Sequence, residues 1–197
     1  MEEEIIYYDK SEYIETDSGN KISRKSVISV PQNIVLGGKT IIQQNCIIRG
    51  DLRRKGSGYA VVIGIGKYCL LGEDSIIRPP YKIYKGVFSY YPMKISDYVH
   101  IGQRTIVEAA RIGQYVIIGN DCVIGRFSVI KEYCRILDNT VIPPNTVIPS
   151  FSVYGGNPGR FISELPESSQ IIFEQKAKQY YDRFIAKIEE DDKKTSN

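Results

Sequence analysis

A branched aliphatic residue recurs every six positions through most of this chain, and no other feature constrains the fold as strongly. An α-helix would place apolar residues three and four positions apart, and an amphipathic strand would alternate them, so neither explains a sustained period of six. An internal repeat of this kind predicts a solenoid of short strands joined by corners. We call the recurring residues anchors; they are Leu36, Ile42, Ile48, Ile65, Leu71, Ile77, Ile95, Ile101, Val107, Ile112, Ile118, Ile124, Ile130, Ile136, Ile142 and Ile148.

A second column follows four positions after most anchors, and all its members except Leu52 are small or short. Glycine often follows the anchor directly, as at Gly66, Gly102 and Gly119, where we expect a tight corner to favour a residue without Cβ. Three hexads per coil would stack coils at strand spacing, about 4.8 Å, and would give about six coils. The column contains Thr40, Cys46, Leu52, Cys69, Ser75, Val99, Thr105, Val116, Cys122, Ser128, Cys134, Thr140, Thr146 and Ser152.

The sequence therefore predicts an all-β fold, a parallel β-helix with aliphatic ladders inside, followed by a C-terminal α-helix. Parallel strand connections are usually right-handed, but hexapeptide-repeat prisms are generally left-handed. Resemblance to that repeat class, and not the periodicity itself, implies a left-handed β-helix. All four cysteines lie in the small-residue column, so we expect buried, mostly apolar thiols and no disulfide framework.

Composition and charge identify no partner, but they argue against nucleic acid and against membranes. The chain has 26 basic and 23 acidic residues, and a net charge of +3 creates no strong field toward nucleic acid or acidic membranes. The acidic start, Met1 to Glu4, is unlike a signal peptide, and no apolar run approaches the roughly 18 residues of a membrane span. We therefore expect a cytoplasmic protein with no nucleic-acid partner and no membrane insertion.

Five segments are expected along the chain. The first contains a turn-like Asp17–Asn20 stretch between apolar residues, which predicts strands laid over the first coil. Pro166 and Glu167 offer a helix start, and apolar residues recur at helical spacing from Phe173 to Ile188. The segments are an N-terminal cap, 1–33; the β-helix, 34–154; a connector, 155–166; the C-terminal helix, 167–189; and a charged tail, 190–197.

Two stretches interrupt the repeat. Residues 53–58 are basic and glycine-rich, which is typical of a solvated loop. The stretch from Arg78 to Lys94 mixes prolines and aromatic residues with lysines. Aromatic rings among lysines can stack on bases, but the overall charge does not support nucleic acid. A protein contact and plain packing against the prism both remain open for this stretch.

Two enzyme classes use hexapeptide prisms, and the chain resembles the γ-type carbonic anhydrases from Leu36 to about Ile142, including an Arg49-Gly50-Asp51 element. In that family three histidines bind zinc. The corresponding positions here hold Arg78, Gln103 and Glu108, which we interpret as degenerate zinc-ligand positions. Without zinc nothing lowers the pKa of water to about 7, so we expect no metal and no hydratase chemistry.

Hexapeptide acyltransferases often use a histidine as general base, and His100 is the only histidine of the chain. We expect it to be a solvated group at a corner, with no carboxylate evidently placed to orient it. No catalytic residue and no cofactor is therefore assigned, although a hexapeptide-repeat enzyme of either class stays as the alternative function.

The most specific resemblance runs through nearly the whole chain and is to the dynactin subunit 5 family. It is carried by 10–16 with 18–21, by 32–36, 46–52 and 75–80, by 136–141, and by 164–167 at the expected helix start. The basic insertion at 53–58 and the acidic tail depart from the family. These departures do not affect the expected prism, but they leave the contacts that the family's loops would make in doubt.

This resemblance implies a non-catalytic scaffold subunit of the pointed-end complex of dynactin, in the cytoplasm and on the cytoskeleton. The implied partners are dynactin subunit 6, dynactin subunit 4, the pointed-end actin-related protein and dynein cargo adaptors, and the implied role is filament capping and adaptor engagement in dynein-mediated transport. Our candidate partner contacts are Arg49 and Asp51, for which a surface ion pair within the chain is equally open, together with Tyr81, Lys82, Tyr84 and Lys85.

Overall fold

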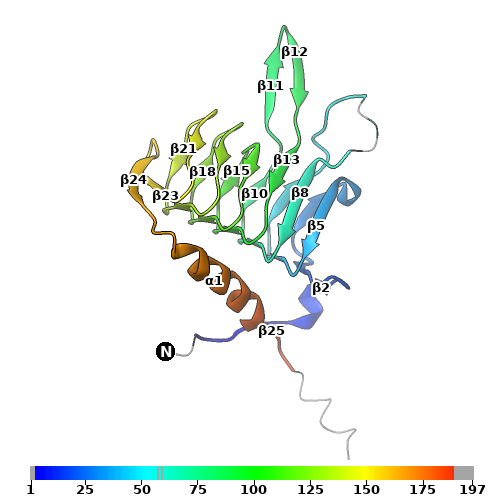
Figure 1. Cartoon of the computed structure of the whole chain (residues 1–197). Helices are drawn as coiled ribbons and strands as arrows, with labels where there is room; N and C mark the ends of the chain where they lie inside the picture. Colours follow the sequence, from blue (N-terminus) through cyan, green and yellow to red (C-terminus); the bar gives the residue numbers. More distant parts are fainter. Residues whose placement is uncertain (1–2, 57, 59, 189–197) are drawn as a thin grey trace, which may run out of the picture.

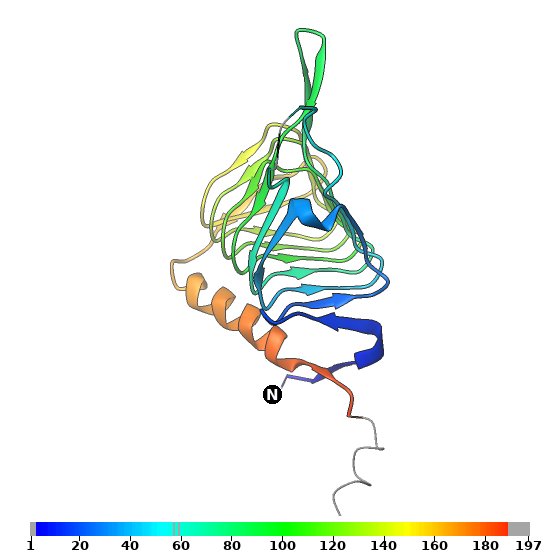
Figure 2. The ribbon, with the colours of Figure 1, turned by 90° about the vertical axis from the view of Figure 1, so that its right-hand side faces the viewer.

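The computed structural model describes residues 3–188 except Ser57 and Tyr59. The chain folds as a left-handed parallel β-helix with a C-terminal α-helix, which confirms the predicted fold class. Successive coils stack into a three-sided prism, a helix lies along one side, and a hairpin projects at the opposite end of the view (Figures 1 and 2). No helix among the described residues is long and apolar enough to cross a membrane.

Each side of the prism is one sheet, and we call the three sheets I, II and III. Sheet I contains β4 (Val27–Ser29), β7 (Ile47–Arg49), β10 (Ile76–Ile77), β15 (Ile106–Val107), β18 (Val123–Ile124) and β21 (Val141–Ile142). Sheet II contains β5 (Ile34–Gly38), β8 (Ile63–Lys67), β13 (Met93–Ile95), β16 (Arg111–Ile112), β19 (Val129–Ile130) and β22 (Val147–Ile148). Sheet III contains β2 (Tyr13–Glu15), β3 (Lys21–Ser23), β6 (Ile41–Ile42), β9 (Leu70–Leu71), β14 (His100–Ile101), β17 (Ile117–Ile118), β20 (Arg135–Ile136), β23 (Ser152–Gly155) and β24 (Arg160–Glu164).

The anchors form the interior of the prism. Within each sheet, anchor pairs with anchor from coil to coil, as Ile77 does with Val107 and Val107 with Ile124. Every anchor is at most 2% exposed except Leu36, which is half-buried in the first coil. Burying one such side chain stabilises the fold by about 1.5–3 kcal/mol, so these ladders supply most of the driving force for folding.

The prism begins earlier than residue 34, the expected boundary. Ile22 and Ile28, which are six residues apart, pair with the anchors Ile42 and Ile48 and pack against the core. They extend the six-residue beat toward the N-terminus, so part of the expected cap is the first coil. The first coil is covered by β2, which pairs antiparallel with β3 across the turn at Gly19.

Glycine follows the anchors for a different reason from the expected corner. At Gly102 an added Cβ would lie 2.5 Å from the backbone of Gly119 in the next coil. The glycine therefore permits close approach between coils. The left-handed corners instead hold ordinary residues, including Tyr98, Tyr115 and Tyr133 at φ of 57 to 58°, a conformation that is uncommon for bulky side chains.

Prolines mark the last coil. One coil earlier, the amides of Gly125 and Lys131 donate to Ile142 and Ile148 and so tie neighbouring coils together. Pro143 and Pro149 occupy the equivalent positions in the last coil and have no N–H to donate to a further coil. Proline at a sheet edge prevents further strand pairing, so the sequence itself ends the stack here.

The helix α1 (Ser169–Arg183) lies against sheet III beside a corner of stacked aromatic rings. These rings continue from coil to coil at centroid distances of 4.7–5.5 Å, and Lys178 of α1 lies over one of them. Phe173 and Ala177 are the buried apolar residues of the helix. The stacked rings are Tyr68, Tyr98, Tyr115, Tyr133 and Phe151.

The C-terminal segments differ from the expected boundaries. The expected connector, 155–166, contains β24, and the helix spans 169–183 within the expected 167–189. The helix ends before Phe184 because β25 (Phe184–Ala186) pairs parallel with β1 (Ile6–Tyr8). The Phe184 ring stacks on the Tyr8 ring, with the two ring centroids 4.7 Å apart. Ile188 is 82% exposed, so the helical stripe does not extend to it. The tail, 190–197, lies outside the described residues.

Candidate partner-contact site

The candidate contacts Arg49 and Asp51 form an ion pair within the chain at the end of β7. The Arg49 guanidinium donates to both carboxylate oxygens of Asp51, at 2.8 and 2.7 Å. These hydrogen bonds hold the pKa of Asp51 below its usual value. Gly50 lies between them, and an added Cβ there would come within 2.6 Å of the Ser29 carbonyl oxygen. The pair is therefore fixed on a rigid corner of the prism.

The degenerate zinc-ligand positions do not form one cluster within the chain. Arg78 and Glu108 follow neighbouring strands of sheet I, and the Arg78 guanidinium donates to Glu108 at 3.0 Å. Gln103 follows β14 of sheet III instead, where its amide oxygen accepts a hydrogen bond from Arg104 at 3.1 Å. A divalent cation placed beside Glu108 would meet a guanidinium. Among the described residues, no group of three or more His, Cys, Asp or Glu side chains is placed to hold a metal ion.

His100 is covered by α1, which corrects the expectation of a solvated corner residue. It lies on β14 with its ring 5.7 Å from that of Tyr180, in an edge-to-face arrangement. Burial, helped by the charge of Lys176, lowers the pKa of His100 to about 4. The neutral ring is shielded from an acyl donor by the helix.

The stretch after Arg78 forms a projecting β-hairpin, made of β11 (Tyr81–Tyr84) and β12 (Val87–Tyr90) (Figure 1). Lys85 and Gly86 have φ of 49 and 75°, which is the conformation of a tight hairpin turn. The hairpin leaves large apolar side chains in solvent. Their exposed fractions are 67% for Ile83, 63% for Tyr84, 65% for Val87 and 49% for Phe88.

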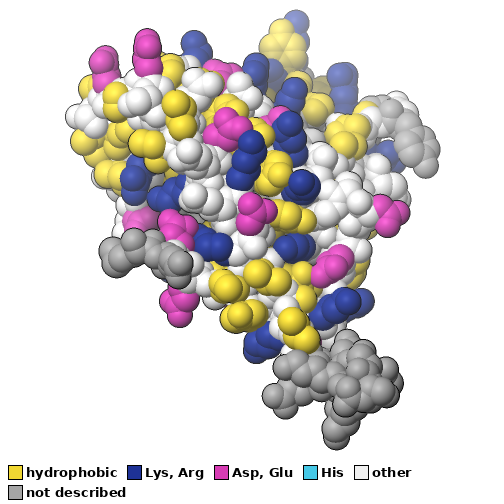
Figure 3. Space-filling model, turned by 60° about the horizontal axis from the view of Figure 1, so that its bottom comes forward, with side chains coloured by type: hydrophobic (Ala, Val, Ile, Leu, Met, Phe, Trp, Pro, Cys, Tyr) yellow, Lys and Arg dark blue, Asp and Glu magenta, His cyan; other side chains and the backbone are white. Residues whose placement is uncertain are grey.

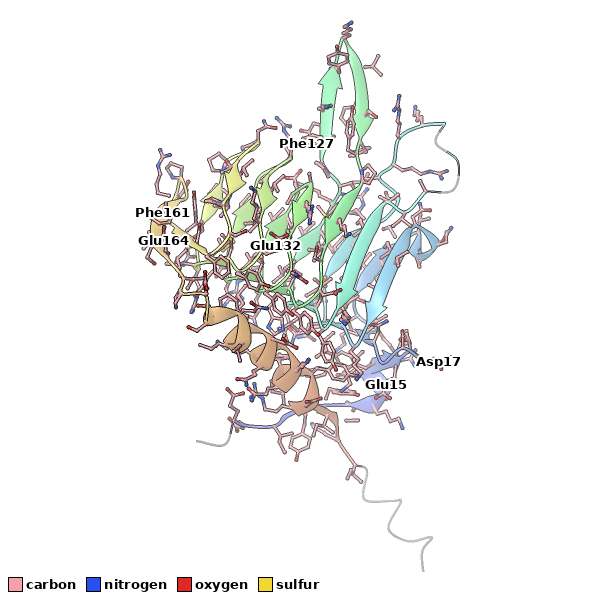
Figure 4. All side chains as sticks on the ribbon, viewed as in Figure 1. Glu15, Asp17, Phe127, Glu132, Phe161 and Glu164 are labelled. Atoms are coloured by element: carbon pink, nitrogen blue, oxygen red, sulfur yellow. The ribbon has the colours of Figure 1, made fainter. Side chains whose placement is uncertain are left out.

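The base of the hairpin is held and its tip is free. Lys82 lies over the Tyr91 ring at 4.6 Å, and Tyr91 packs edge-on against Phe127 at 5.4 Å. Arg126 stacks over Tyr81 at 4.8 Å. Figure 4 shows Phe127 beside the hairpin base. Of the four candidate contacts on the hairpin, Tyr81 and Lys82 therefore anchor it, whereas Tyr84 and Lys85 project beyond it.

A groove of about 700 Å³ lies between the hairpin and the basic insertion. Its walls combine cationic and aromatic side chains, and among the described residues no Asp or Glu lines it. Lys85 lies 5.4 Å from the Tyr84 ring centroid. The groove is lined by Arg53, Arg54, Lys55, Tyr84, Lys85, Val87, Phe88, Ser89, Tyr90 and Tyr91.

The sequence held a signal for the hairpin that our prediction missed. Tyr81–Tyr84 and Val87–Tyr90 are two four-residue runs with strand-forming residues, joined by the turn-compatible Lys85-Gly86. Two such runs around a two-residue turn indicate a β-hairpin. The prolines before the first run and the lysines within it and at the turn, Lys82 and Lys85, favour a loop interpretation instead.

Comparisons with known proteins decide the family. A sequence profile described as dynactin subunit 5 matches residues 1–189. Dynactin subunit 5 of Dictyostelium discoideum is 44% identical over 185 residues, which cover 94% of this chain and 89% of that protein. This chain belongs to the dynactin subunit 5 family. The resemblance predicted from sequence is confirmed over nearly the whole length of the protein.

Two solved structures of bacterial proteins share the fold. A hexapeptide transferase family protein from Anaplasma phagocytophilum is 14% identical with a TM-score of 0.59, covering 92% of this chain and 96% of that chain. AntD, an N-acyltransferase from Bacillus cereus, is 19% identical with a TM-score of 0.63, covering 88% and 97%. At these identities the likeness extends to the fold alone.

Proposed function

We propose that this chain is a non-catalytic subunit of the pointed-end complex of dynactin. It pairs there with dynactin subunit 6, beside dynactin subunit 4 and the pointed-end actin-related protein, and helps to cap the actin-related filament in the cytoplasm. Its further role is to help dynein engage cargo adaptors. Membership of the dynactin subunit 5 family supports a dynactin role.

The projecting hairpin is the observation that carries adaptor engagement. Contiguous exposed apolar side chains on a folded protein mark an interaction site, and here they stand beside Lys85 and the basic loop on a rigid prism. A preformed surface binds at little cost in ordering. The candidate contacts Tyr84 and Lys85 lie at its exposed tip, and Tyr81 and Lys82 set its direction.

The non-catalytic assignment is supported by what fills the enzyme positions. Arg78 pairs with Glu108 where the carbonic anhydrases place zinc ligands. His100 is neutral and covered by α1, so it is poorly placed to take a proton from an acyl acceptor. Arg49 and Asp51 stay as proposed partner contacts, already held in one geometry by their own hydrogen bonds.

Tagging the endogenous protein and identifying the proteins that co-purify tests this proposal. We expect the other pointed-end subunits in near-equal amounts. A variant with Tyr84→Ser and Lys85→Glu at the tip should still co-purify with these subunits but recruit adaptors several-fold less well. A matched control, Val147→Ser with Lys131→Glu, changes exposed residues away from the hairpin and should behave as wild type. Failure of the wild-type chain to co-purify with dynactin would overturn the proposal.

A further inference from the structure

Lys21, on β3 in the first coil, is enclosed by side chains from both ends of the chain. Its Nζ lies 4.2 Å from the ring centroid of Tyr181, 5.6 Å from that of Tyr8 and 5.8 Å from that of Phe184. The same Nζ donates a hydrogen bond to the backbone carbonyl oxygen of Phe184. A cation is attracted to the face of an aromatic ring within about 6 Å. One lysine of the prism therefore contacts the last turn of α1, the start of β25 and the end of β1.

The strap, by which we mean α1 and β25 together with β1, covers part of sheet III. Beneath it lie Ile41, which is 1% exposed, the half-buried Leu70, and His100, whose ring meets that of Tyr180. Figure 3, which brings the underside of the molecule forward, shows charged side chains of both signs interspersed with hydrophobic ones. Lifting the strap would uncover an apolar part of sheet III.

The strap has few contacts of its own that would keep it in place. The buried residues of α1 are Ser169, Phe173 and Ala177, and no side chain caps the start of the helix. The strands β1 and β25 form a separate two-stranded sheet, and a sheet of two strands is marginally stable on its own. A segment with few buried contacts opens at a lower free energy than the core. The attachment of β25 therefore depends on the side chains of the prism that it meets, Lys21 among them.

The chemistry of Lys21 makes this attachment sensitive to acylation. Burial lowers the pKa of Lys21, against the opposing charges of Glu15 and Asp182, and the neutral amine is the form that attacks a carbonyl. With an acyl thioester, the amine nitrogen forms a C–N bond to the acyl carbon, the C–S bond breaks, and the thiol leaves with the proton that the nitrogen loses. The product amide is uncharged, so it loses the attraction to the rings, and the added acetyl group has to fit among them.

We propose that Lys21 is a latch for the strap, and that acetylation of its Nζ releases β25 and the last turn of α1 from the prism. The positive charge keeps the strap closed over Leu70 and His100, and its removal opens this part of sheet III. The latch operates within one chain, so it goes beyond the proposed function and does not depend on it.

Amide hydrogen exchange of the full-length chain, with Lys21 replaced by acetyl-lysine, tests the latch. The amides of β25 and of Lys187, which donates to the Tyr8 carbonyl oxygen at 2.8 Å, should exchange about tenfold faster or more. The inner coils should be unchanged. Lys21→Arg keeps the charge and should remain near wild type. The matched control is acetyl-lysine in place of Lys85, which lies beside the Tyr84 ring but far from the strap, and it should leave β25 unchanged.

His100 provides a second readout because the chain has one histidine. In proton NMR its pKa should rise from about 4 in the wild type toward 6.5 in the chain acetylated at Lys21. In the native wild type, an acetyl thioester should modify Lys21, as read by peptide mass spectrometry.

Four results would overturn the latch. Unchanged exchange of β25 after acetylation would show that Lys21 does not hold the strap. Equal acceleration by Lys21→Arg would show that the charge is not what holds it. Loss of the cooperative melt of the prism in circular dichroism would make Lys21 a requirement for folding instead. No acetylation of Lys21 until the chain is denatured would exclude it as a modification site.

Discussion

Ile124 and Val123 are neighbours on β18 that point in opposite directions, and they permit a matched test of the prism. Ile124 is 0% exposed within the anchor ladder, whereas Val123 is half-buried and points outward from sheet I. Ile124→Ala removes three buried carbon groups, at about 0.8 kcal/mol each, and leaves a cavity, so we expect it to lower the free energy of unfolding by roughly 3–4 kcal/mol. Val123→Ala removes two carbon groups that are only partly buried, which gives about 0.8 kcal/mol.

Urea unfolding followed by circular dichroism measures both losses in the isolated chain. The slope of free energy against urea should be unchanged for Val123→Ala, because the surface exposed on unfolding is nearly the same. Equal losses for the two variants, or a larger loss at Val123, would refute the inward assignment of the anchors.

Three further outcomes follow from the same structure. Gly102→Ala should destabilise by about 1–3 kcal/mol in thermal melts, because its Cβ would lie 2.5 Å from the next coil, whereas Gly58→Ala, with nothing within 4 Å, should have no effect. The pKa of His100 is 6.5 in the unfolded chain and about 4 in the folded chain, so between these pH values the imidazole is protonated only in the unfolded chain. The free energy of unfolding should therefore drop by up to about 3 kcal/mol as the pH falls from 6.5 to 4. His100→Leu should flatten this part of the pH profile relative to wild type, and an unchanged profile would contradict the burial of the ring. The four buried thiols, with pKa values raised by burial, for example to about 11 for Cys46, should resist maleimide in the native protein and react fully in denaturant.

The repeat was predictable because each anchor occupies the same local environment in every coil. A six-residue beat fixes the strand, its inward side chain and its neighbour one coil away, so the ladder and the cysteine positions follow from the sequence. The residue before each anchor can also be read from the sequence, as in Ile76-Ile77 and Val123-Ile124, but only the structure shows which outer face of the prism α1 covers.

Other features depend on contacts between distant parts of the chain. The end of α1 at Arg183 is set by pairing of Phe184–Ala186 with Ile6–Tyr8, which no local propensity indicates. The covering of His100 likewise requires α1, about 80 residues later in the chain, to dock on sheet III. The degenerate zinc-ligand positions Arg78, Gln103 and Glu108 were placed by resemblance, and the fold separates Gln103 from the other two.

Amide hydrogen exchange of the chain, alone and within purified dynactin, tests the central claim most directly, namely that a rigid aliphatic prism presents its outer surface to partners. We expect slow exchange along the inner coils in both states, because amides such as those of Ile106 and Ile117 donate to the next coil at 2.9 and 3.0 Å. The hairpin Tyr81–Tyr90 should exchange quickly in the free chain and slow down only in the assembly. Fast exchange throughout the coils of the free chain, or a hairpin equally exposed in both states, would contradict the account.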